Sequence, residues 1–365
     1  MNALGIDDSA LGLEFVTRCE KRGAYLTIST IDHLEAGNFL TRAEAGALME
    51  ELLSGHVDTA EIVELLLALN RRPVRVEELT GFAAAMRGRA TAVFAAGETR
   101  PQNMVDTCGT GGDGSGTFNI STAAALVASA AGARVAKHGN RAATSRVGSA
   151  DVLEALGVRI DLPFADYGRA IREIGIGFFF AQAAHTAARH AAAARKQIGV
   201  RTVFNLLGPL TNPAGAQAQV LGVPSPELIG VVAATLAELG VTRAFVVHGA
   251  GGMDEISLAG ETLIAEVRNG SISRYTVSPE TFGVGNAPLA TLAGGNAQDN
   301  AEIIRRVLRG EAGPAQDVVL INAAAALTAA EVAEDFRGGV ALAREALRAG
   351  RAYGKLEELV KFTNP

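Results

Sequence analysis

The 365-residue sequence contains no tryptophan, only four tyrosines and only two cysteines. Cys19 and Cys108 are too few for a disulfide framework or a structural zinc site, so free thiols are expected. No run of about 18 consecutive apolar residues occurs, which excludes a membrane-spanning helix. The first eleven residues lack the basic stretch and apolar core of a signal peptide. These absences together predict a cytoplasmic protein without membrane contact.

Positive charge is also scarce, because 33 Lys and Arg residues stand against 39 Asp and Glu residues, for a net charge of −6. A general nucleic-acid binder usually carries a basic field, so the balance argues against nucleic acid as a partner. Apolar residues form 48% of the chain and charged residues 20%. These are ordinary globular values, and they exclude disorder as a description of the whole chain.

Helical signals dominate the early part of the chain. Thr41 and Glu44 have the spacing of a capping box, and Asp58 with Glu61 repeats that signal before another run of apolar residues at helical intervals. A further helix is expected over 76–86.

We therefore predict an all-helical domain over 29–98, with roughly 185–215 packing on it. Residues 1–28 show only weak periodicity and form an N-terminal extension without an assigned structure.

The texture changes at Pro101, after which short apolar runs alternate with helical segments. Strands are expected at 104–106, 134–137, 220–223 and 244–247, and helices at 121–131, 150–156, 228–239, 300–308 and much of 332–362. Alternation of this kind is typical of a mainly parallel sheet covered by helices. The sequence thus predicts a larger α/β domain, formed by 99–184 and 216–365, hinged to the small helical domain.

A glycine-rich loop comes after the first expected strand. Five glycines in the eight residues 109–116 let the backbone turn tightly and approach a ligand with its N–H groups. Asn119, Ser121 and Thr122 then open a helix, whose free N–H groups and positive dipole end are able to hold phosphate. A capped turn without a ligand is the alternative.

The residues after this loop narrow the kind of phosphate ligand. The loop lacks the Lys-Ser/Thr ending of a P-loop. The next strand ends in Lys137-His138, where a dinucleotide site would carry an acidic residue. A cation at that position favours another phosphate ligand.

A second polar cluster runs from Lys137 to Ser149 and contains Lys, Arg, hydroxyl and amide side chains. In parallel sheets such a loop lies at the carboxyl ends of the strands, beside the glycine-rich loop, where charge-assisted bonds to phosphate are expected. Two alternatives stay open, namely Ser149 as a plain helix cap and Arg141 as a solvated surface charge.

An adjacent acidic pair, Asp254-Glu255, comes after the strand expected at 244–247. Mg²⁺ prefers a small number of carboxylates together with waters and substrate phosphates, so this pair is a candidate metal site. A surface acidic pair is the alternative.

Together these clusters resemble the anthranilate phosphoribosyltransferase family, over about 36–362. The resemblance is carried by Gly109–Asp113 with Thr117–Thr122, Lys137–Ser145 with Gly148–Gly157, Arg201–Asn205 with Gly208–Leu210 and Asn212-Pro213, and Met253–Glu255.

The resemblance implies transfer of the phosphoribosyl group of 5-phosphoribosyl-1-diphosphate to anthranilate, with release of pyrophosphate. It further implies the nucleoside-phosphorylase/phosphoribosyltransferase type of fold, Mg²⁺ as cofactor, a homodimer formed through the helical domain and no covalent protein nucleophile.

The same resemblance assigns residues to three ligands. For the sugar diphosphate it implies Gly109, Gly112, Asp113, Thr117, Asn119, Ile120, Ser121, Thr122, Lys137, Ser145 and Ser149. For anthranilate it implies Gly109, His138, Asn140, Arg195, Gly208 and Pro209. For Mg²⁺ it implies Ser121, Asp254 and Glu255.

The chain departs from the family mainly around the acceptor. Gln182 and Thr186 stand where prolines are common, Ala193-Ala194 precedes Arg195 in place of Pro-Val, and Gly251 replaces a frequent Asp. His185 is either a channel residue or an ordinary buried histidine. Two alternatives therefore stay open: an enzyme of the same fold with another acceptor, including a nucleoside phosphorylase, and a non-catalytic nucleic-acid-binding relative.

Overall fold

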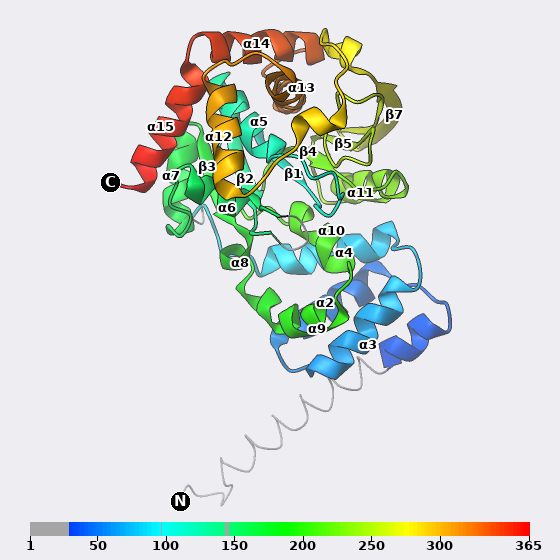
Figure 1. Ribbon diagram of the computed structural model, residues 1–365. Helices are drawn as coiled ribbons and strands as arrows, with labels where there is room; N and C mark the ends of the chain where they lie inside the picture. The colour runs from blue at the N-terminus through cyan, green and yellow to red at the C-terminus, as the bar shows by residue number, and fades with distance from the viewer. Residues whose placement is uncertain (1–28, 96, 143–145) are drawn as a thin grey trace, which may run out of the picture. The chain divides into compact units, whose positions relative to one another are not determined.

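The computed structural model describes residues 29–95, 97–142 and 146–365 (Figure 1). The N-terminal extension expected over 1–28, with Cys19, lies outside the described residues, and so does the candidate site residue Ser145. The chain divides into two compact units. The helical unit consists of residues up to Arg89 together with Thr186–Phe204, and the α/β unit of Ala90–His185 together with Asn205–Pro365.

The helical unit is built from short helices whose apolar faces meet. After a helical stretch at 29–35, its elements are α2 (Arg42–Ser54), α3 (Thr59–Asn70), α4 (Val76–Gly88), η1 (Thr186–Ala191) and α9 (Ala192–Ile198). Helix α2 packs against α4 and η1, while α3 packs against α9. Leu48, Leu52, Leu65 and Leu66 are buried in the resulting core.

The predicted helix starts are confirmed at both positions. The Glu44 N–H donates to the Thr41 hydroxyl, and the Glu44 carboxylate accepts from the Thr41 N–H, which is a complete capping box. The Asp58 carboxylate accepts from the Glu61 N–H at 2.9 Å and begins α3.

A buried carboxylate ties the start of α4 to the preceding chain. Glu78 is fully buried, and it accepts hydrogen bonds from the N–H groups of Leu40 and Arg75 while both its oxygens meet the Arg72 guanidinium. Burial alone would raise the pKa of Glu78, but the bonds from Arg72, Leu40 and Arg75 bring the net pKa below its ordinary value. Glu78 is therefore an ionised group at neutral pH in the middle of the unit.

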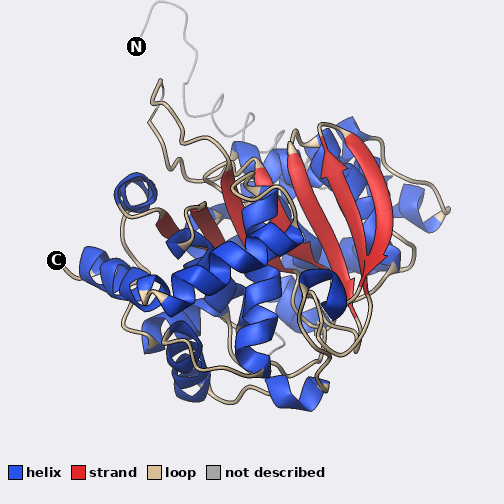
Figure 2. Cartoon of the chain, turned by 90° about the horizontal axis from the view of Figure 1, so that it is seen from above, coloured by secondary structure: helices blue, strands red, loops and turns tan. Residues whose placement is uncertain are grey.

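The α/β unit contains one seven-stranded sheet in the order β3-β2-β1-β4-β5-β6-β7 (Figure 2). The strands are β1 (Met104–Gly109), β2 (Arg134–Gly139), β3 (Ile176–Phe180), β4 (Ala218–Gly222), β5 (Arg243–Gly249), β6 (Thr262–Arg268) and β7 (Ser271–Val277). Strands β1 to β5 pair in parallel, and β6 and β7 add an antiparallel hairpin at one edge. The mainly parallel sheet expected from the sequence is confirmed.

The α/β unit also contains α-helices and short 3₁₀ helices, several of which pack on the sheet. They are α5 (Ile120–Ala130), α6 (Ser149–Ala155), α7 (Phe164–Glu173), α8 (Ala181–Ala184), α10 (Val203–Leu210), α11 (Glu227–Glu238), η2 (Pro279–Phe282), η3 (Leu289–Leu292), α12 (Ala297–Leu308), α13 (Pro314–Ala329), α14 (Phe336–Arg348) and α15 (Arg351–Thr363). Helices α5 and α13 pack on β1, α7 on β3, and α11 on β5 and β6. Every residue of β4 is buried, as expected for a central parallel strand covered on both faces.

Several elements of this unit were not expected from the sequence, among them β3, β6, β7, α7, α10 and α13. The β6–β7 hairpin turns at Asn269-Gly270, whose φ values of 49° and 81° are those of a tight hairpin turn. The Asn-Gly pair was the signal that would have found it. Helix α13 is buried on nearly all sides, so its sequence shows no amphipathic period to recognise.

The boundaries predicted for the helical domain include residues that belong to the α/β unit. Val93 and Phe94 belong to the core of the α/β unit, where they lie against Gly168 of α7, so 90–98 is not part of the helical unit. Residues 205–215 also belong to the α/β unit, because the Asn212 amide donates to the Asp106 carboxylate and to the Ala136 carbonyl of the sheet.

Among the described residues, no helix is both long and apolar enough to cross a membrane.

Candidate functional site

The polar motifs gather where the parallel strands end. Because β1, β2, β4 and β5 are parallel, the chain segments that come after them leave from one edge of the sheet, called here the carboxyl edge. These segments include the glycine-rich loop 109–117, the second loop 140–148 and the acidic segment 250–257.

The acidic segment lies against the glycine-rich loop. The Gly111 N–H donates to Asp254 Oδ2 at 2.8 Å, and the Asp254 N–H donates to Asp113 Oδ2 at 3.4 Å. Two glycines make this approach possible, since a Cβ at Gly109 would lie 2.1 Å from Asp254 Oδ2 and one at Gly222 would lie 1.5 Å from the Asp254 carbonyl oxygen. Gly109 thus provides space for the Asp254 carboxylate.

Glu255 reaches the start of α5. Its Oε1 accepts from the Ser121 N–H at 3.0 Å, at the helix end where N–H groups lack helical partners. Burial of the carboxylate and the neighbouring Asp254 raise the pKa of Glu255 to about 8, against the opposing effect of Lys137. The two adjacent acidic groups therefore repel each other, and a cation between them would relieve that repulsion.

The two carboxylates of the acidic pair match the small number of protein ligands that Mg²⁺ commonly uses. No group of three or more His, Cys, Asp or Glu side chains in the described part of the chain is arranged to hold a metal by itself. Mg²⁺ binds through one or two carboxylates and completes its shell with water and substrate phosphates, which is what Asp254 and Glu255 allow. Ser121 is next to this pair through its main-chain N–H, while its hydroxyl lies 3.5 Å from Lys137 Nζ.

Lys137 is buried beneath the two loops. Its Nζ donates to the Thr107 carbonyl at 2.7 Å, and only 3% of the residue is exposed. Burial lowers the pKa of Lys137, while the negative charges of Asp106 and Glu255 raise it. The ammonium therefore lies between the β1 main chain and the acidic pair.

Sequence reasoning assigned no role to Asp106, which lies at the centre of a buried network. Its carboxylate accepts from the His138 N–H at 3.1 Å and from Asn212 Nδ2 at 2.8 Å. Gln219 Nε2 donates to the Pro209 carbonyl at 2.7 Å and to Cys108 Sγ at 3.2 Å. Asp106 lies within β1, and its partners Asn212 and His138 are distant in sequence, so no local sequence signal indicated this network.

His138, Gly208 and Pro209, which the family resemblance assigns to anthranilate, are brought together. His138 Nδ1 lies 3.1 Å from the Gly208 carbonyl, so Nδ1 carries the hydrogen of the neutral ring. Burial, and after it the neighbouring His185, lowers the pKa of His138 to about 3. His138 Nε2 is buried and has no hydrogen-bond partner among the described residues, which leaves an acceptor at this place.

His185 is a buried neighbour of His138. The ring centroids are 5.5 Å apart in an edge-to-face arrangement, and His185 Nε2 lies 2.9 Å from the Thr211 carbonyl. Both histidines are therefore anchored to the main chain between Gly208 and Thr211.

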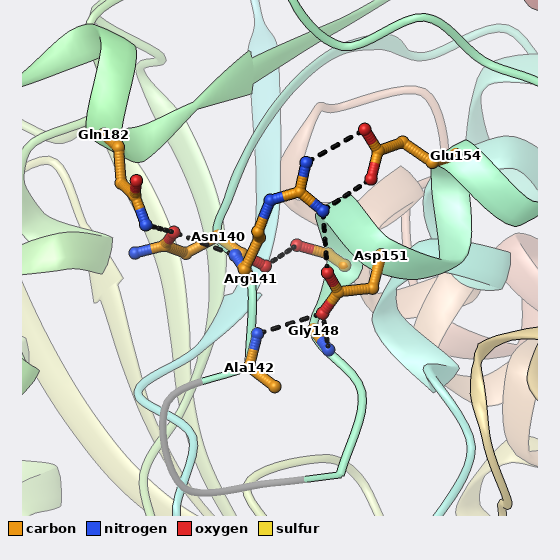
Figure 3. Close-up of polar contacts among 8 residues, drawn as sticks. Asn140, Arg141, Ala142, Gly148, Asp151, Glu154 and Gln182 are labelled. Carbon is orange, nitrogen blue, oxygen red and sulfur yellow. Dashed lines mark hydrogen bonds and ion pairs between the residues drawn. The ribbon is translucent and has the colours of Figure 1, made fainter.

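The second loop is closed by one acidic side chain (Figure 3). Asp151 Oδ2 accepts from the N–H groups of Ala142 and Gly148, at 3.0 and 2.9 Å, and Arg141 pairs with both Asp151 and Glu154. These ion pairs raise the pKa of Arg141. Arg141 is therefore an exposed charge that is paired with carboxylates of α6.

Ser149 and Asn140 face each other across this loop. The cap of α6 is Gly148, so the interpretation of Ser149 as the helix cap is wrong. Ser149 Oγ donates instead to the Asn140 carbonyl at 3.4 Å, and Asn140 Oδ1 accepts from Gln182 Nε2 at 3.4 Å (Figure 3). Gln182 thus contacts a predicted acceptor residue.

The remaining predicted residues of the glycine-rich loop and the start of α5 differ in their hydrogen bonds and burial. Asn119 Nδ2 donates to the Val147 carbonyl at 3.1 Å and joins the two loops. Thr117 Oγ1 lies 3.3 Å from Ser115 Oγ, while Gly112 has the left-handed φ of 71°. The side chains of Ile120 and Thr122 are buried at 1% exposure, and their N–H groups donate to the Phe118 and Asn119 carbonyls.

Arg195 belongs to the helical unit. It lies on α9, with its guanidinium 5.2 Å from the centroid of the Phe204 ring. Partial burial lowers the pKa of Arg195.

Comparisons with known proteins agree on one family. Residues 101–353 match the family described as "Glycosyl transferase family, a/b domain", and residues 28–90 match "Glycosyl transferase family, helical bundle domain". Anthranilate phosphoribosyltransferase of Pelotomaculum thermopropionicum is 50% identical over 92% of this chain and 96% of its own.

Solved structures give the same result. Anthranilate phosphoribosyltransferase from Thermus thermophilus superposes with a TM-score of 0.86, is 47% identical and covers 92% of this chain and 99% of its own. The enzyme from Saccharomyces cerevisiae in complex with PRPP and Mg has a TM-score of 0.83 at 27% identity, over 93% and 98% of the two chains. The comparisons favour neither an enzyme with another acceptor nor a nucleic-acid-binding relative. The chain belongs to the anthranilate phosphoribosyltransferase family of glycosyltransferases.

Proposed function

We propose that the carboxyl edge performs the reaction of the family, in which the anthranilate amine attacks C1 of 5-phosphoribosyl-1-diphosphate and pyrophosphate leaves. The observation that supports this most is the acidic pair, because Asp254 is bonded to the glycine-rich loop and Glu255 to the first turn of α5. Carboxylates held beside a phosphate-binding loop suit a substrate that arrives with a metal ion.

The donor substrate takes the positions between the two loops. Main-chain N–H groups of 109–117 bind its diphosphate, with Asp113, Thr117, Asn119, Ser121, Lys137 and Ser149 around it. Lys137 contributes positive charge from below the loop, since its Nζ is within 3.5 Å of Ser121 Oγ. The residues of the α/β unit thus hold the leaving group where its negative charge develops.

Asp254 and Glu255 hold Mg²⁺ in this proposal. Bound there, the ion neutralises charge on the departing pyrophosphate. The protein supplies no covalent nucleophile, and catalysis rests on positioning and electrostatics.

The acceptor takes the positions around His138, Asn140 and Gly208-Pro209. His138 is neutral near pH 7, because burial and His185 lower its pKa to about 3, so its Nε2 keeps a lone pair that can face the substrate amine. The unpartnered Nε2 accepts a hydrogen bond from that amine, and Arg195 is proposed for the anthranilate carboxylate.

The test is a fluorescence assay with the purified protein, 5-phosphoribosyl-1-diphosphate, Mg²⁺ and anthranilate. Loss of anthranilate emission that requires both Mg²⁺ and the sugar diphosphate is the expected result. Binding of the sugar diphosphate without consumption of anthranilate would contradict anthranilate as the acceptor but would not contradict the proposed donor site.

The metal role is tested by Asp254→Ala and Glu255→Ala in the same assay. Each change removes one of two carboxylates from the proposed Mg²⁺ site, so turnover with Mg²⁺ should fall by roughly a hundredfold or more. Unchanged turnover in both variants would refute the metal role.

A homodimer formed through the helical unit is part of this proposal. Sedimentation of the 37.6-kDa chain should give twice the monomer mass, and a monomer at micromolar concentration would contradict it.

A further inference from the structure

Asn300 is a buried amide outside the family motifs, on the first turn of α12. Only 2% of it is exposed. Its Oδ1 accepts from the Gly295 N–H at 2.7 Å, and its Nδ2 donates to Asn119 Oδ1 at 3.0 Å. Asn119 in turn donates from Nδ2 to the Val147 carbonyl at 3.1 Å. A single chain of hydrogen bonds therefore connects α12, the N-cap residue of α5 and the second loop.

The direction of this chain is fixed at both ends by the main chain. The Gly295 N–H can only donate, so the oxygen of the Asn300 amide must face it and the nitrogen must face Asn119. The Val147 carbonyl can only accept, so Asn119 must present its nitrogen there and its oxygen to Asn300. Rotating either amide by 180° would set like groups against each other.

The segment before Asn300 is also bound to the glycine-rich loop. The Phe118 N–H donates to the Leu292 carbonyl, and the Gly294 N–H donates to the Gly116 carbonyl, at 3.0 and 2.9 Å. Gly294 leaves room for this approach, since a Cβ there would lie 2.7 Å from Asn300 Oδ1 and 2.9 Å from the Phe118 backbone. The end of the loop is therefore positioned by 292–300 as well as by its own glycines.

We infer that Asn300 is a positioning residue for the donor substrate: it sets the orientation of the Asn119 amide and, through Asn119, couples the glycine-rich loop to the second loop. The inference rests on the proposed function, because both loops are assigned there to the sugar diphosphate. Asn300 contacts Asn119, and in this proposal Asn119, not Asn300, contacts the substrate. Its loss should therefore weaken binding of the sugar diphosphate more than that of anthranilate.

The sharpest test is Asn300→Asp, which keeps the acceptor for the Gly295 N–H and the size of the side chain but loses the donor to Asn119. At pH 8 the dissociation constant for 5-phosphoribosyl-1-diphosphate with Mg²⁺, measured by calorimetry without anthranilate, should rise on the order of tenfold. A protonated carboxyl regains an O–H donor. The ratio of variant to wild-type dissociation constants should therefore fall toward one between pH 8 and pH 5.

Asn300→Ala separates this effect from a loss of packing. It removes both donor and acceptor, so its ratio to wild type should be raised and should not recover at low pH. Asn296→Asp is the matched control. It adds the same charge four residues away, and a carboxylate serves equally as the cap that Asn296 provides for α12, so its ratio should stay near one.

The outcomes are distinct. An Asn300→Asp ratio near one at pH 8, or a raised ratio that does not change with pH, overturns the inference. If Asn300→Asp does not fold, Asn300→Ala decides, because binding within twofold of wild type refutes a positioning role. The wild-type titration and the anthranilate assay judge the proposed function separately, while the variant ratios judge Asn300.

Discussion

At the scale of single residues, Gly222 at the end of β4 controls the position of the acidic pair. A Cβ there would lie 1.5 Å from the Asp254 carbonyl oxygen, a contact with main chain that no side-chain rotation relieves. The backbone of the acidic segment would have to move away from β1 and β4. The small size of Gly222 is therefore part of the proposed metal site, although the residue carries no functional group.

Gly222→Ala should lower stability by about 1–3 kcal/mol and reduce turnover at saturating Mg²⁺, because it displaces Asp254. Urea unfolding and the anthranilate assay measure the two effects. Gly354→Ala on α15 is the control, since nothing lies within 4 Å of its added Cβ and alanine favours a helix by about 0.5–1 kcal/mol. Equal behaviour of the two variants would show that Asp254 tolerates displacement.

His138 makes a pH-dependent contribution to stability. Burial and His185 lower its folded-state pKa to about 3 from the ordinary histidine value of 6.5, so between these values the unfolded chain binds the extra proton. The contribution of His138 to the free energy of unfolding is therefore fully present above pH 6.5 and is lost as pH falls, by roughly 2 kcal/mol at pH 5. In His138→Gln this component should disappear, and a slope of stability with pH identical to wild type would refute it. Urea unfolding at pH 7 and pH 5 is the measurement.

At the scale of elements, the start of α4 depends on Glu78, which satisfies two N–H groups and the Arg72 guanidinium at once. A surface capping residue would have water as a substitute partner. Glu78 has none available, because it is fully buried.

Glu78→Gln should destabilise the helical unit by about 3 kcal/mol, since it leaves the Arg72 charge without its partner. Because the net pKa of Glu78 is lowered, its contribution is present above the ordinary glutamate pKa and is lost as pH falls through the folded-state value. Circular dichroism during urea unfolding tests both points. The exposed neighbour Glu77→Gln should change stability by less than about 0.5 kcal/mol, and similar losses in both variants would contradict the argument.

Elements with a local signal could be predicted from the sequence, and those defined by tertiary contacts could not. Thr41 with Glu44 and Asp58 with Glu61 mark helix starts because a cap is made within four residues. Helix α13 has no such signal, since it is buried on nearly all sides. The hairpin of β6 and β7 did carry one, the Asn269-Gly270 turn, which sequence reasoning overlooked.

The same distinction applies to the candidate site. Motifs indicated the glycine-rich loop, Lys137 and the acidic pair, because their residue types alone suggest phosphate and metal chemistry. Asp106 and Asn300 carry no such signal, since each acts through partners distant in sequence, Asn212 and Asn119. Only the fold shows these pairings.

At the scale of the whole molecule, the proposed ligands draw on different units. All described residues proposed for the sugar diphosphate lie in the α/β unit, whereas Arg195 lies in the helical unit. Changes in one unit should therefore affect the two substrates unequally.

Arg195→Ala should raise KM for anthranilate by about tenfold or more, because a charge-assisted bond to the carboxylate is lost, and should leave the affinity for the sugar diphosphate unchanged. Steady-state kinetics with each substrate varied in turn measures both. Arg195→Lys retains the charge and should recover part of the loss. A rise in KM confined to the sugar diphosphate would contradict the assignment of Arg195 to the acceptor site.

The division of the chain into two units also determines how the gene can be split into two separately expressed fragments. The chain passes between the units three times, after Arg89, His185 and Phe204, so the helical unit is not one continuous stretch of sequence. A gene split after Arg89 would yield a fragment that ends with α4, while η1 and α9 stay on the other fragment. Reassembly within that unit would then rest on contacts between the two fragments, such as the packing of α2 on η1 and of α3 on α9 and the hydrogen bond from Asn70 Nδ2 to the Arg201 carbonyl. Two separately expressed halves should therefore complement each other, and a graft of the helical unit from a relative requires two exchanged segments.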